Sequence, residues 1–145
     1  MQIIPVSYAE VLDEGHKLFE GYAAECSIPE IGKTDPQREI YFAMERNGVA
    51  QCFGVYAEKL VGFASLLISV LPHYGKKVAV VESIYVDPEY RPFVGKDMLL
   101  ELEDYALKAG CVAILYSTPT GSRFEKLLSL KKGYRHTNTV FTKAL

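Results

Sequence analysis

The sequence predicts a mixed α/β domain in which one β-sheet carries helices on both of its faces. Segments with helical spacing of apolar residues alternate with β-rich segments in the order β-α-α-β-β-β-α-β-α-β. The segment CVAILYS, residues 111–117, is apolar at nearly every position, which is typical of a strand covered on both faces. Together these observations favour a sheet in which antiparallel hairpins and a parallel crossover are combined.

Length and composition indicate one soluble globular domain over residues 1–145. The chain is 49% hydrophobic and 23% charged, and its net charge of −2 predicts no general attraction to nucleic acid. Its three cysteines form no Cys-x-x-Cys or Cys/His pairing, so neither a metal site nor a disulfide framework is expected. The chain also lacks a signal peptide and any apolar run of the roughly 18–20 residues that span a membrane. We therefore expect a cytoplasmic protein with no membrane partner.

The first third of the chain predicts a strand and two helices. Residues 2–6 suit a short strand that Pro5 confines to an edge or a strand end. Ser7 and Glu10 then form a capping box, after which an apolar stripe predicts a helix up to Tyr22. A second helix is expected from Asp35, with a proline in its first turn, to Gly48.

The remainder predicts three strands, a helix, and then a strand, a helix and a strand. Residues 50–71 read as a β-hairpin with its turn at Glu58-Lys59, and residues 76–87 as a further strand joined through HYGK. The last four elements are a helix at 96–109, a strand at 111–117, a helix at 122–132 and a strand at 134–145.

The segment VESIYVDPEYRPFVGKDMLLELEDYA, residues 81–106, joins a buried strand to a helix through a tight turn. A helix N-terminus offers unpaired N–H groups and the positive end of its macrodipole, and so favours an anion. Amides of residues 94–97 are candidates for this role, Gly95 permits close approach, and Arg91 and Lys96 add positive charge. The alternative is that both cations are ordinary surface residues.

Glu82 interrupts the apolar run VAVVESIYV, which is otherwise typical of a central strand. A buried, unpaired carboxylate is costly, and burial would make it a better proton acceptor. The alternative is a structural glutamate that pairs with a helix cation or reaches solvent at a splayed strand edge. Both interpretations stay open at this point.

The order of elements and two segments resemble the GCN5-related N-acetyltransferase (GNAT) superfamily. VDPEYR before the turn and MLLELEDYA after it are similar to the flanks of the family's R/Q-x-x-G-x-G/A motif, and FEKLLSLKKGYRHT is similar to its fourth helix. The motif itself departs from the pattern, because Val94 and Lys96 occupy the glycine positions and Gly95 lies between them. Ser129 stands where the family commonly has a tyrosine.

The resemblance implies an enzyme that passes the acetyl group of acetyl-CoA directly to a primary amine of a small molecule, peptide or protein, without a metal. It implies Glu82 as the general base and Tyr134, or alternatively Tyr116, as the general acid. The implied acetyl-CoA contacts are Ile84, Tyr85, Val86, Arg91, Pro92, Phe93, Val94, Gly95, Lys96, Asp97 and Ser117. His73 and Tyr74 are the implied acceptor contacts. The alternatives left open are a catalytically weak or inactive module of the same fold that binds acyl-CoA or a partner, and a homodimer in place of a monomer.

Overall fold

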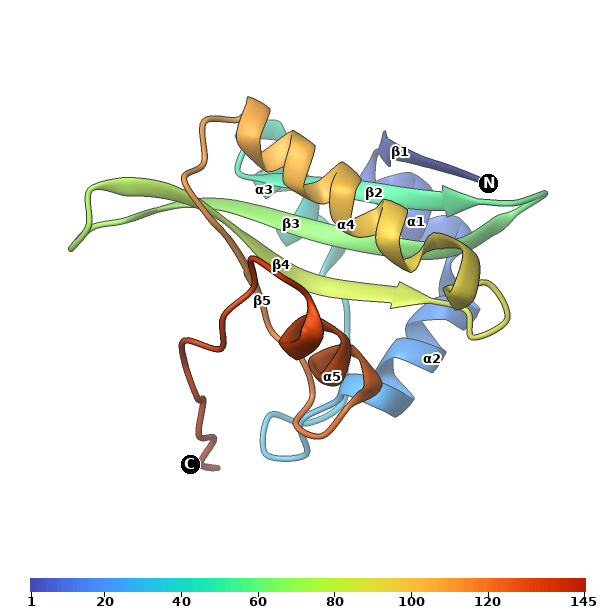
Figure 1. The fold of residues 1–145 in the computed structure, drawn as a ribbon. Coiled ribbons are helices and arrows are strands. Elements are labelled where there is room, and N and C mark those ends of the chain that lie inside the picture. The colour runs from blue at the N-terminus through green and yellow to red at the C-terminus, as the bar shows by residue number, and fades with distance from the viewer.

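The computed structural model describes residues 1–145 and shows a five-stranded sheet with five helices (Figure 1). The mixed α/β class is confirmed. In chain order the elements are β1 (Gln2–Val6), α1 (Tyr8–Glu14), α2 (His16–Cys26), α3 (Arg38–Arg46), β2 (Ala50–Tyr56), β3 (Leu60–Leu71), β4 (Lys76–Val86), α4 (Arg91–Lys108), β5 (Ile114–Tyr116) and α5 (Arg123–Leu130).

The sheet follows the order of the chain, β1-β2-β3-β4-β5. The first four strands pair antiparallel, whereas β5 runs parallel to β4 because α4 carries the chain back across the sheet. The hairpin turn at Glu58-Lys59 is confirmed, and Pro5 lies in the edge strand β1, where its missing N–H is tolerated.

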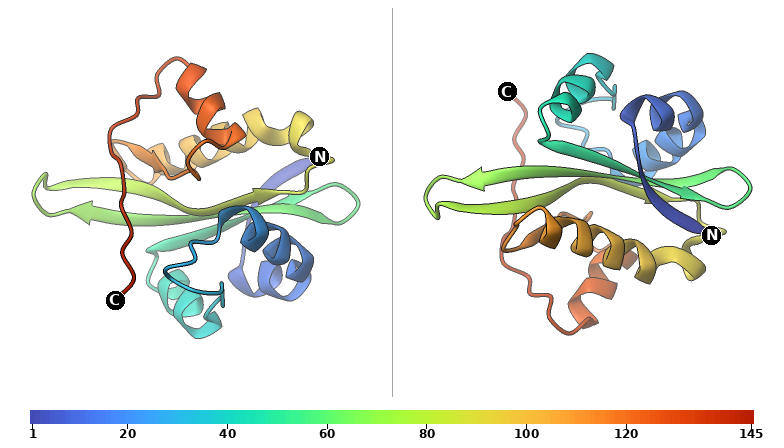
Figure 2. Two further views of the ribbon diagram at one scale, coloured as in Figure 1. Left: turned by 90° about the horizontal axis from the view of Figure 1, so that it is seen from below. Right: turned by 90° about the horizontal axis from the view of Figure 1, so that it is seen from above.

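Helices cover both faces of the sheet and create two cores (Figure 2). On one face, α4 packs Met98 and Leu102 against β-strand residues such as Phe53. On the other face, α1 and α2 contribute Val11 and Leu18, which pack around Phe63. Full burial of one such side chain stabilises the fold by about 1.5–3 kcal/mol, so the two layers together hold the sheet rigid from both sides.

The first predicted helix is divided into α1 and α2 at Gly15. Ser7 caps α1 as expected, because its hydroxyl accepts from the Glu10 N–H at 3.2 Å. The Gly15 N–H then closes the helix on the carbonyl of Val11 at 2.8 Å, and a Cβ at Gly15 would lie 2.5 Å from that oxygen. Glycine therefore allows the chain to change direction between the two helices.

The second predicted helix begins at Arg38 rather than at Asp35. Gln37 has extended backbone angles at the N-cap, and its side-chain amide donates back to Asp35 at 2.8 Å. The residue before a proline is disfavoured in helical geometry, so Asp35 stays outside the helix.

Helix α4 begins five residues earlier than predicted, at Arg91 instead of Lys96. Pro92 lies in the first turn, where its fixed φ suits a helix start. Gly95 does not interrupt the helix, because it has no positive φ. α4 has 18 residues, yet no helix of the protein is both long and apolar enough to cross a membrane.

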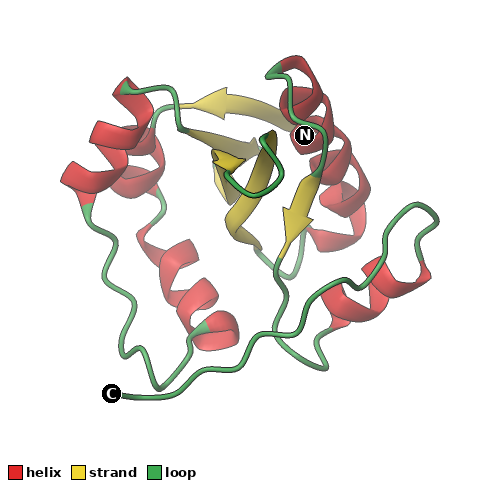
Figure 3. Cartoon of the chain, turned by 90° about the vertical axis from the view of Figure 1, so that its left-hand side faces the viewer, coloured by secondary structure: helices red, strands yellow, loops and turns green.

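Of the last two predicted strands, the one at residues 134–145 is absent, and the one at 111–117 is present but shorter than predicted. Residues 134–145 form no strand, and Val140 and Phe141 are 83% and 91% exposed. The segment leaves α5 and runs away from the sheet (Figures 1 and 3), so its β-rich composition meets no hydrogen-bonding partner. β5 is only three residues long and forms an edge of the sheet, so the expected cover on both faces is also absent, with Val112 65% and Leu115 38% exposed.

Candidate active site

Glu82 lies in a β-bulge of β4. Ser83 is opposite Ser65 on β3, and Val81 is opposite the next residue, Leu66, so that Glu82 is one extra residue in the strand. The bulge turns its side chain out of the apolar pattern, and Glu82 is exposed. Of the two interpretations left open by the sequence, the buried carboxylate is wrong: Glu82 reaches solvent, and no cation forms an ion pair with it.

Two hydroxyl groups hold the carboxylate of Glu82. The Tyr41 hydroxyl of α3 donates to Oε1 at 3.0 Å, and the Ser83 hydroxyl donates to Oε2 at 2.9 Å. Each carboxylate oxygen thus has one donor and retains the capacity to accept a second hydrogen bond. A carboxylate that is exposed and also oriented is suited to receive a cation or a proton.

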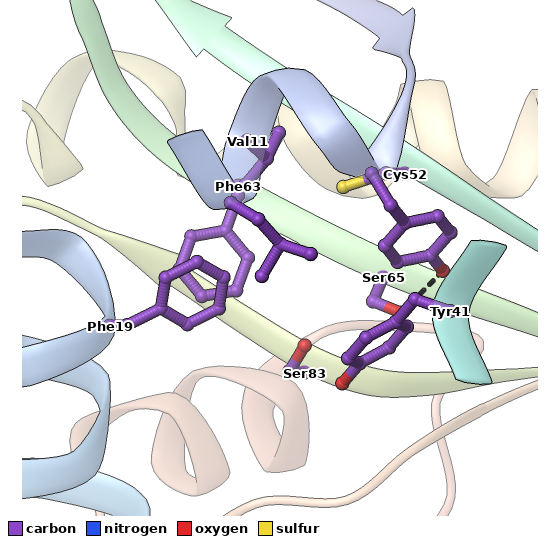
Figure 4. Close-up of a pocket in the computed structure, with 9 residues that line it drawn as sticks. Val11, Phe19, Tyr41, Cys52, Phe63, Ser65 and Ser83 are labelled. Atoms are coloured by element: carbon purple, nitrogen blue, oxygen red, sulfur yellow. Dashed lines mark hydrogen bonds between the residues drawn. The ribbon is translucent and has the colours of Figure 1, made fainter. Parts of the chain in front are cut away.

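Three tyrosines lie near this carboxylate, on the face of the sheet that α1, α2 and α3 cover. The ring of Tyr8 stacks on that of Tyr41 with centroids 4.7 Å apart, and the Tyr8 and Ser65 hydroxyls are hydrogen-bonded at 2.7 Å. They line a small pocket (Figure 4) of about 10 Å³, roughly the space for one water molecule. Burial, followed by the charge of Glu82, raises the pKa of Tyr41, and burial with the nearby Cys26 and Glu82 raises that of Tyr22 to about 12.

The parallel pairing of β4 with β5 ends immediately before Glu82. The last pair is Val81 with Tyr116, after which β4 continues to Val86 without β5 beside it. The Asp87 N–H donates to a carbonyl of β3 at 2.9 Å. Successive N–H groups along a strand point to opposite sides. The N–H groups of Ile84 and Val86 therefore point away from β3, into the gap where β5 has ended. The gap therefore offers two backbone donors next to the carboxylate.

Tyr85 alternates with these two residues and has a different environment. Its N–H points toward β3, and its ring packs in the core under α2. A Cβ at Gly21 of α2 would lie 2.2 Å from the Tyr85 hydroxyl, so only glycine permits this close approach.

Arg91 connects the start of α4 to β4 and α2. Its Nε donates to the Val86 carbonyl at 2.7 Å, its Nη2 pairs with Glu25 Oε1 at 2.6 Å, and its guanidinium lies 5.2 Å from the centroid of the Tyr85 ring. Arg91 is therefore more than an ordinary surface cation, because it fixes where α4 begins relative to the gap.

The residues predicted to cradle an anion lie within α4. Val94 is buried in the core, and the amides of Gly95 to Asp97 belong to the second turn, where N–H groups bond to carbonyls four residues earlier. Lys96 and Phe93 are exposed on the first two turns. This helix end can therefore attract an anion through its macrodipole and the charge of Lys96. The amides of Gly95 to Asp97 contribute less, because they bond within the helix.

Tyr134 lies on the other face of the sheet from the Glu82 carboxylate. Its hydroxyl donates to Glu103 of α4, and the Tyr116 hydroxyl donates to the same oxygen at 3.4 Å. Burial and the bond to Glu103 raise the pKa of Tyr134. The structure brings Tyr134 together with Tyr116, and it brings neither into contact with Glu82.

The remaining predicted contacts lie apart from one another. His73 and Tyr74 are exposed at the tip of the β3–β4 hairpin, with ring centroids 4.4 Å apart. Glu82 lies six steps along the extended strand β4 from its first residue, Lys76, so it is roughly 20 Å from the hairpin tip at about 3.3 Å per residue. Ser117 follows β5 directly and is exposed beside the gap.

The cysteines are free thiols, and burial makes the inner ones poor nucleophiles. Cys52 and Cys111 are buried, and burial raises the pKa of Cys52 to about 12. No group of three or more His, Cys, Asp or Glu side chains is arranged to hold a metal ion.

Sequence reasoning missed Tyr41, Ser83 and Glu103 as members of these clusters. Tyr41 is visible in the sequence only as part of a helical apolar stripe, and a bulge leaves no periodic signal that would place Ser83 beside Glu82. Glu103 is one of several acidic residues on an amphipathic helix, so the sequence has no signal that distinguishes it.

Residues 16–124 match the model of the acetyltransferase (GNAT) family, and the chain belongs to this family. No curated protein sequence matches the chain.

Solved structures share the fold at low sequence identity. A ribosomal-protein-alanine N-acetyltransferase from Brucella melitensis biovar Abortus 2308 is 18% identical with a TM-score of 0.71, over 99% of each chain. An aminoglycoside acetyltransferase from an uncultured soil metagenomic sample, in complex with sisomicin, is 15% identical with a TM-score of 0.76, over 99% of this chain and 95% of that one. An acetyltransferase from Trypanosoma brucei is 20% identical with a TM-score of 0.68, over 99% of each chain.

Proposed function

We propose that the protein is an acetyl-CoA-dependent N-acetyltransferase that moves the acetyl group directly from the thioester to a primary amine. The observation that carries this proposal is the juxtaposition at the bulge of β4. There an oriented, exposed carboxylate lies beside a gap in the sheet into which the N–H groups of Ile84 and Val86 point.

The proposed reaction uses the carboxylate as a base and the gap as an oxyanion site. Glu82 accepts a proton from the acceptor's ammonium group, and the freed nitrogen lone pair attacks the thioester carbonyl carbon. The N–H groups of Ile84 and Val86 donate to the carbonyl oxygen as it becomes an oxyanion. When that oxyanion collapses, the carbon–sulfur bond breaks and the thiolate leaves with the electron pair. The nitrogen, which became positively charged in the attack, loses a second proton to form the neutral amide, and the thiolate gains one proton to form the thiol of CoA.

The residues around the gap fit acetyl-CoA. The pantetheine arm would lie along β4 at Ile84, Tyr85 and Val86, with Ser117 on the opposite wall. Its pyrophosphate would meet the positive end of α4. The residues proposed for this end are Arg91, Pro92, Phe93, Val94, Gly95, Lys96 and Asp97.

Tyr134 is the proposed general acid for the departing thiolate. Its hydroxyl is protonated at neutral pH, since burial and Glu103 raise its pKa. To reach the thiolate, the Tyr134 hydroxyl has to give up its hydrogen bond to Glu103.

The acceptor is proposed to be a primary amine of a small molecule or a peptide. One structural neighbour is named for a ribosomal-protein alanine and another was solved with the aminoglycoside sisomicin, so both acceptor classes belong in a screen. His73 and Tyr74 would contact only an acceptor long enough to extend along the β3–β4 hairpin.

Thiol release from acetyl-CoA in the presence of an amine library tests the proposal. We expect release that depends on the amine and a matching mass gain of one acetyl group on the acceptor. Binding of CoA without any turnover across peptides, polyamines and aminoglycosides would contradict it and would favour an acyl-CoA-binding module of the same fold.

A further inference from the structure

We propose that Tyr41 of α3 is a positioning residue that holds the Glu82 carboxylate in the orientation in which it receives the acceptor's proton. This inference rests on the proposed function, because it assumes that Glu82 is the base. It adds a helix remote from β4 in the sequence to the machinery of the site.

Glu82 needs such a support because of the bulge. An exposed glutamate on a strand has several rotamers, and holding it in one of them costs conformational entropy that the hydrogen bonds have to offset. The hydrogen bond from Tyr41 at 3.0 Å and the one from Ser83 at 2.9 Å engage different carboxylate oxygens, so together they define the plane of the group. Ser83 is next to Glu82 in strand β4. Tyr41 is therefore the donor that comes from outside the strand.

Tyr41 is itself fixed by packing. Its ring stacks on Tyr8 at an interplanar angle of 19°, and the Tyr8 hydroxyl is tied to Ser65 of β3 at 2.7 Å. The Tyr8 N–H also donates to Glu45 of α3 at 3.0 Å, which links the start of α1 to the helix that carries Tyr41. The phenol is thus held between two helices and the sheet.

The chemistry of the phenol indicates positioning and not proton transfer. Tyr41 donates to the carboxylate, and burial and the charge of Glu82 raise its pKa, so the phenol stays protonated across the neutral range. Because the Tyr41 phenol remains a hydrogen-bond donor, it can orient the Glu82 carboxylate but cannot accept the ammonium proton.

Tyr41→Phe tests the inference, since it removes the hydroxyl and keeps the stacked ring. Tyr56→Phe is the matched control, because the Tyr56 hydroxyl also donates to a glutamate, Glu10, at 2.6 Å but lies outside the site. We expect Tyr41→Phe to lower kcat about 10- to 100-fold, the loss expected for one hydrogen bond to a charged group, with the KM for acetyl-CoA unchanged. Tyr56→Phe is expected to retain the wild-type kcat.

A double-mutant cycle separates positioning from a general structural effect. If Tyr41 acts through Glu82, adding Tyr41→Phe to Glu82→Gln lowers kcat by much less than it does in the wild type. A full, multiplicative loss in the double variant, or equal kcat values for Tyr41→Phe and Tyr56→Phe, would overturn the inference. A normal kcat for Glu82→Gln alone would instead overturn the proposed base, and with it the role of Tyr41.

A second measurement does not depend on turnover. Carbon-13 NMR of the Glu82 side-chain carboxyl is expected to change in chemical shift in Tyr41→Phe and to stay the same in Tyr56→Phe. An unchanged Glu82 resonance in Tyr41→Phe would show that the hydroxyl does not hold the carboxylate.

Discussion

At the scale of single residues, the site depends on one inserted residue, Glu82, which forms a bulge in strand β4. Without the bulge, strict alternation would direct neighbouring side chains of β4 to opposite faces. The inserted Glu82 allows its own carboxylate to meet the hydroxyl of Ser83, its neighbour in the chain, and that of Tyr41 on α3. The same insertion shifts the alternation beyond it, so that Ile84 and Val86 direct their N–H groups to the gap. One insertion thus creates both the oriented carboxylate and the donors beside it.

A residue-scale prediction concerns Cys52 and alkaline pH. In the folded protein burial raises the pKa of this thiol from 9.0 to about 12, whereas the unfolded chain loses the proton near the ordinary value. The stabilisation from Cys52 is therefore fully present below pH 9 and is lost as pH rises toward 12.

We expect the free energy of unfolding, measured with urea between pH 9 and 10, to fall less steeply with pH in Cys52→Ala than in the wild type. The limiting difference in slope is about 1.4 kcal/mol per pH unit for one group. Equal slopes in the two proteins would mean that the folded state does not retain the Cys52 proton.

At the scale of elements, the middle of α4 and its start have different functions. Its middle supplies Met98 and Leu102 to the core, and its start is tied by Arg91 to the end of β4 and to Glu25 of α2. The positive end of the macrodipole is therefore held at a fixed place beside the gap. This arrangement makes the start of α4 the element that recognises the charged part of CoA in our proposal.

Lys96→Glu is the corresponding test. We expect it to weaken CoA binding by about 1–3 kcal/mol, the range for hydrogen bonds to charged groups, and to have a smaller effect at high salt. Lys143→Glu in the exposed C-terminal segment makes the same change in net charge and is expected to leave CoA affinity unaltered. Isothermal titration with CoA and with pantetheine measures both, and equal affinity of Lys96→Glu and Lys143→Glu for CoA would contradict the assignment.

Particular elements show why the sequence predicted the sheet better than the site. The hairpin around Glu58-Lys59 and strand β4 follow from local turn signals and β-rich runs, and both are confirmed. The site depends on a long-range relation, the register between Ser65 and Ser83, which no local pattern contains. The same limit explains the final strand, because the β-rich composition around Val140 says nothing about whether a partner strand is within reach.

At the scale of the whole molecule, the two cores hold the sheet from both faces and the residues after α5 contribute little to either. Val140 and Phe141 are almost fully exposed, whereas Tyr134 still contacts Glu103 of α4. The part of the chain that carries the fold therefore ends near Tyr134.

Deletion of residues 138–145 tests this boundary. We expect the melting temperature to change by no more than about 2 °C, because surface changes away from packed features alter stability by about 0.5 kcal/mol or less. Tyr134→Ala is the contrasting variant, since it removes the contact with Glu103, and it is expected to melt at a lower temperature than the truncated chain. A large fall in melting temperature on truncation would show that the segment packs as part of the fold.

The role of Glu82 as the base is tested by the kcat of Glu82→Gln with the best acceptor found. This substitution keeps the shape of the side chain and one of its two hydrogen-bond acceptor oxygens while it removes the basic carboxylate. We expect a kcat lowered by roughly 10²–10⁴-fold, with CoA affinity and melting temperature close to those of the wild type. A wild-type kcat per folded molecule, with or without a loss of stability, would contradict it and would leave Glu82 as a structural residue of the bulge.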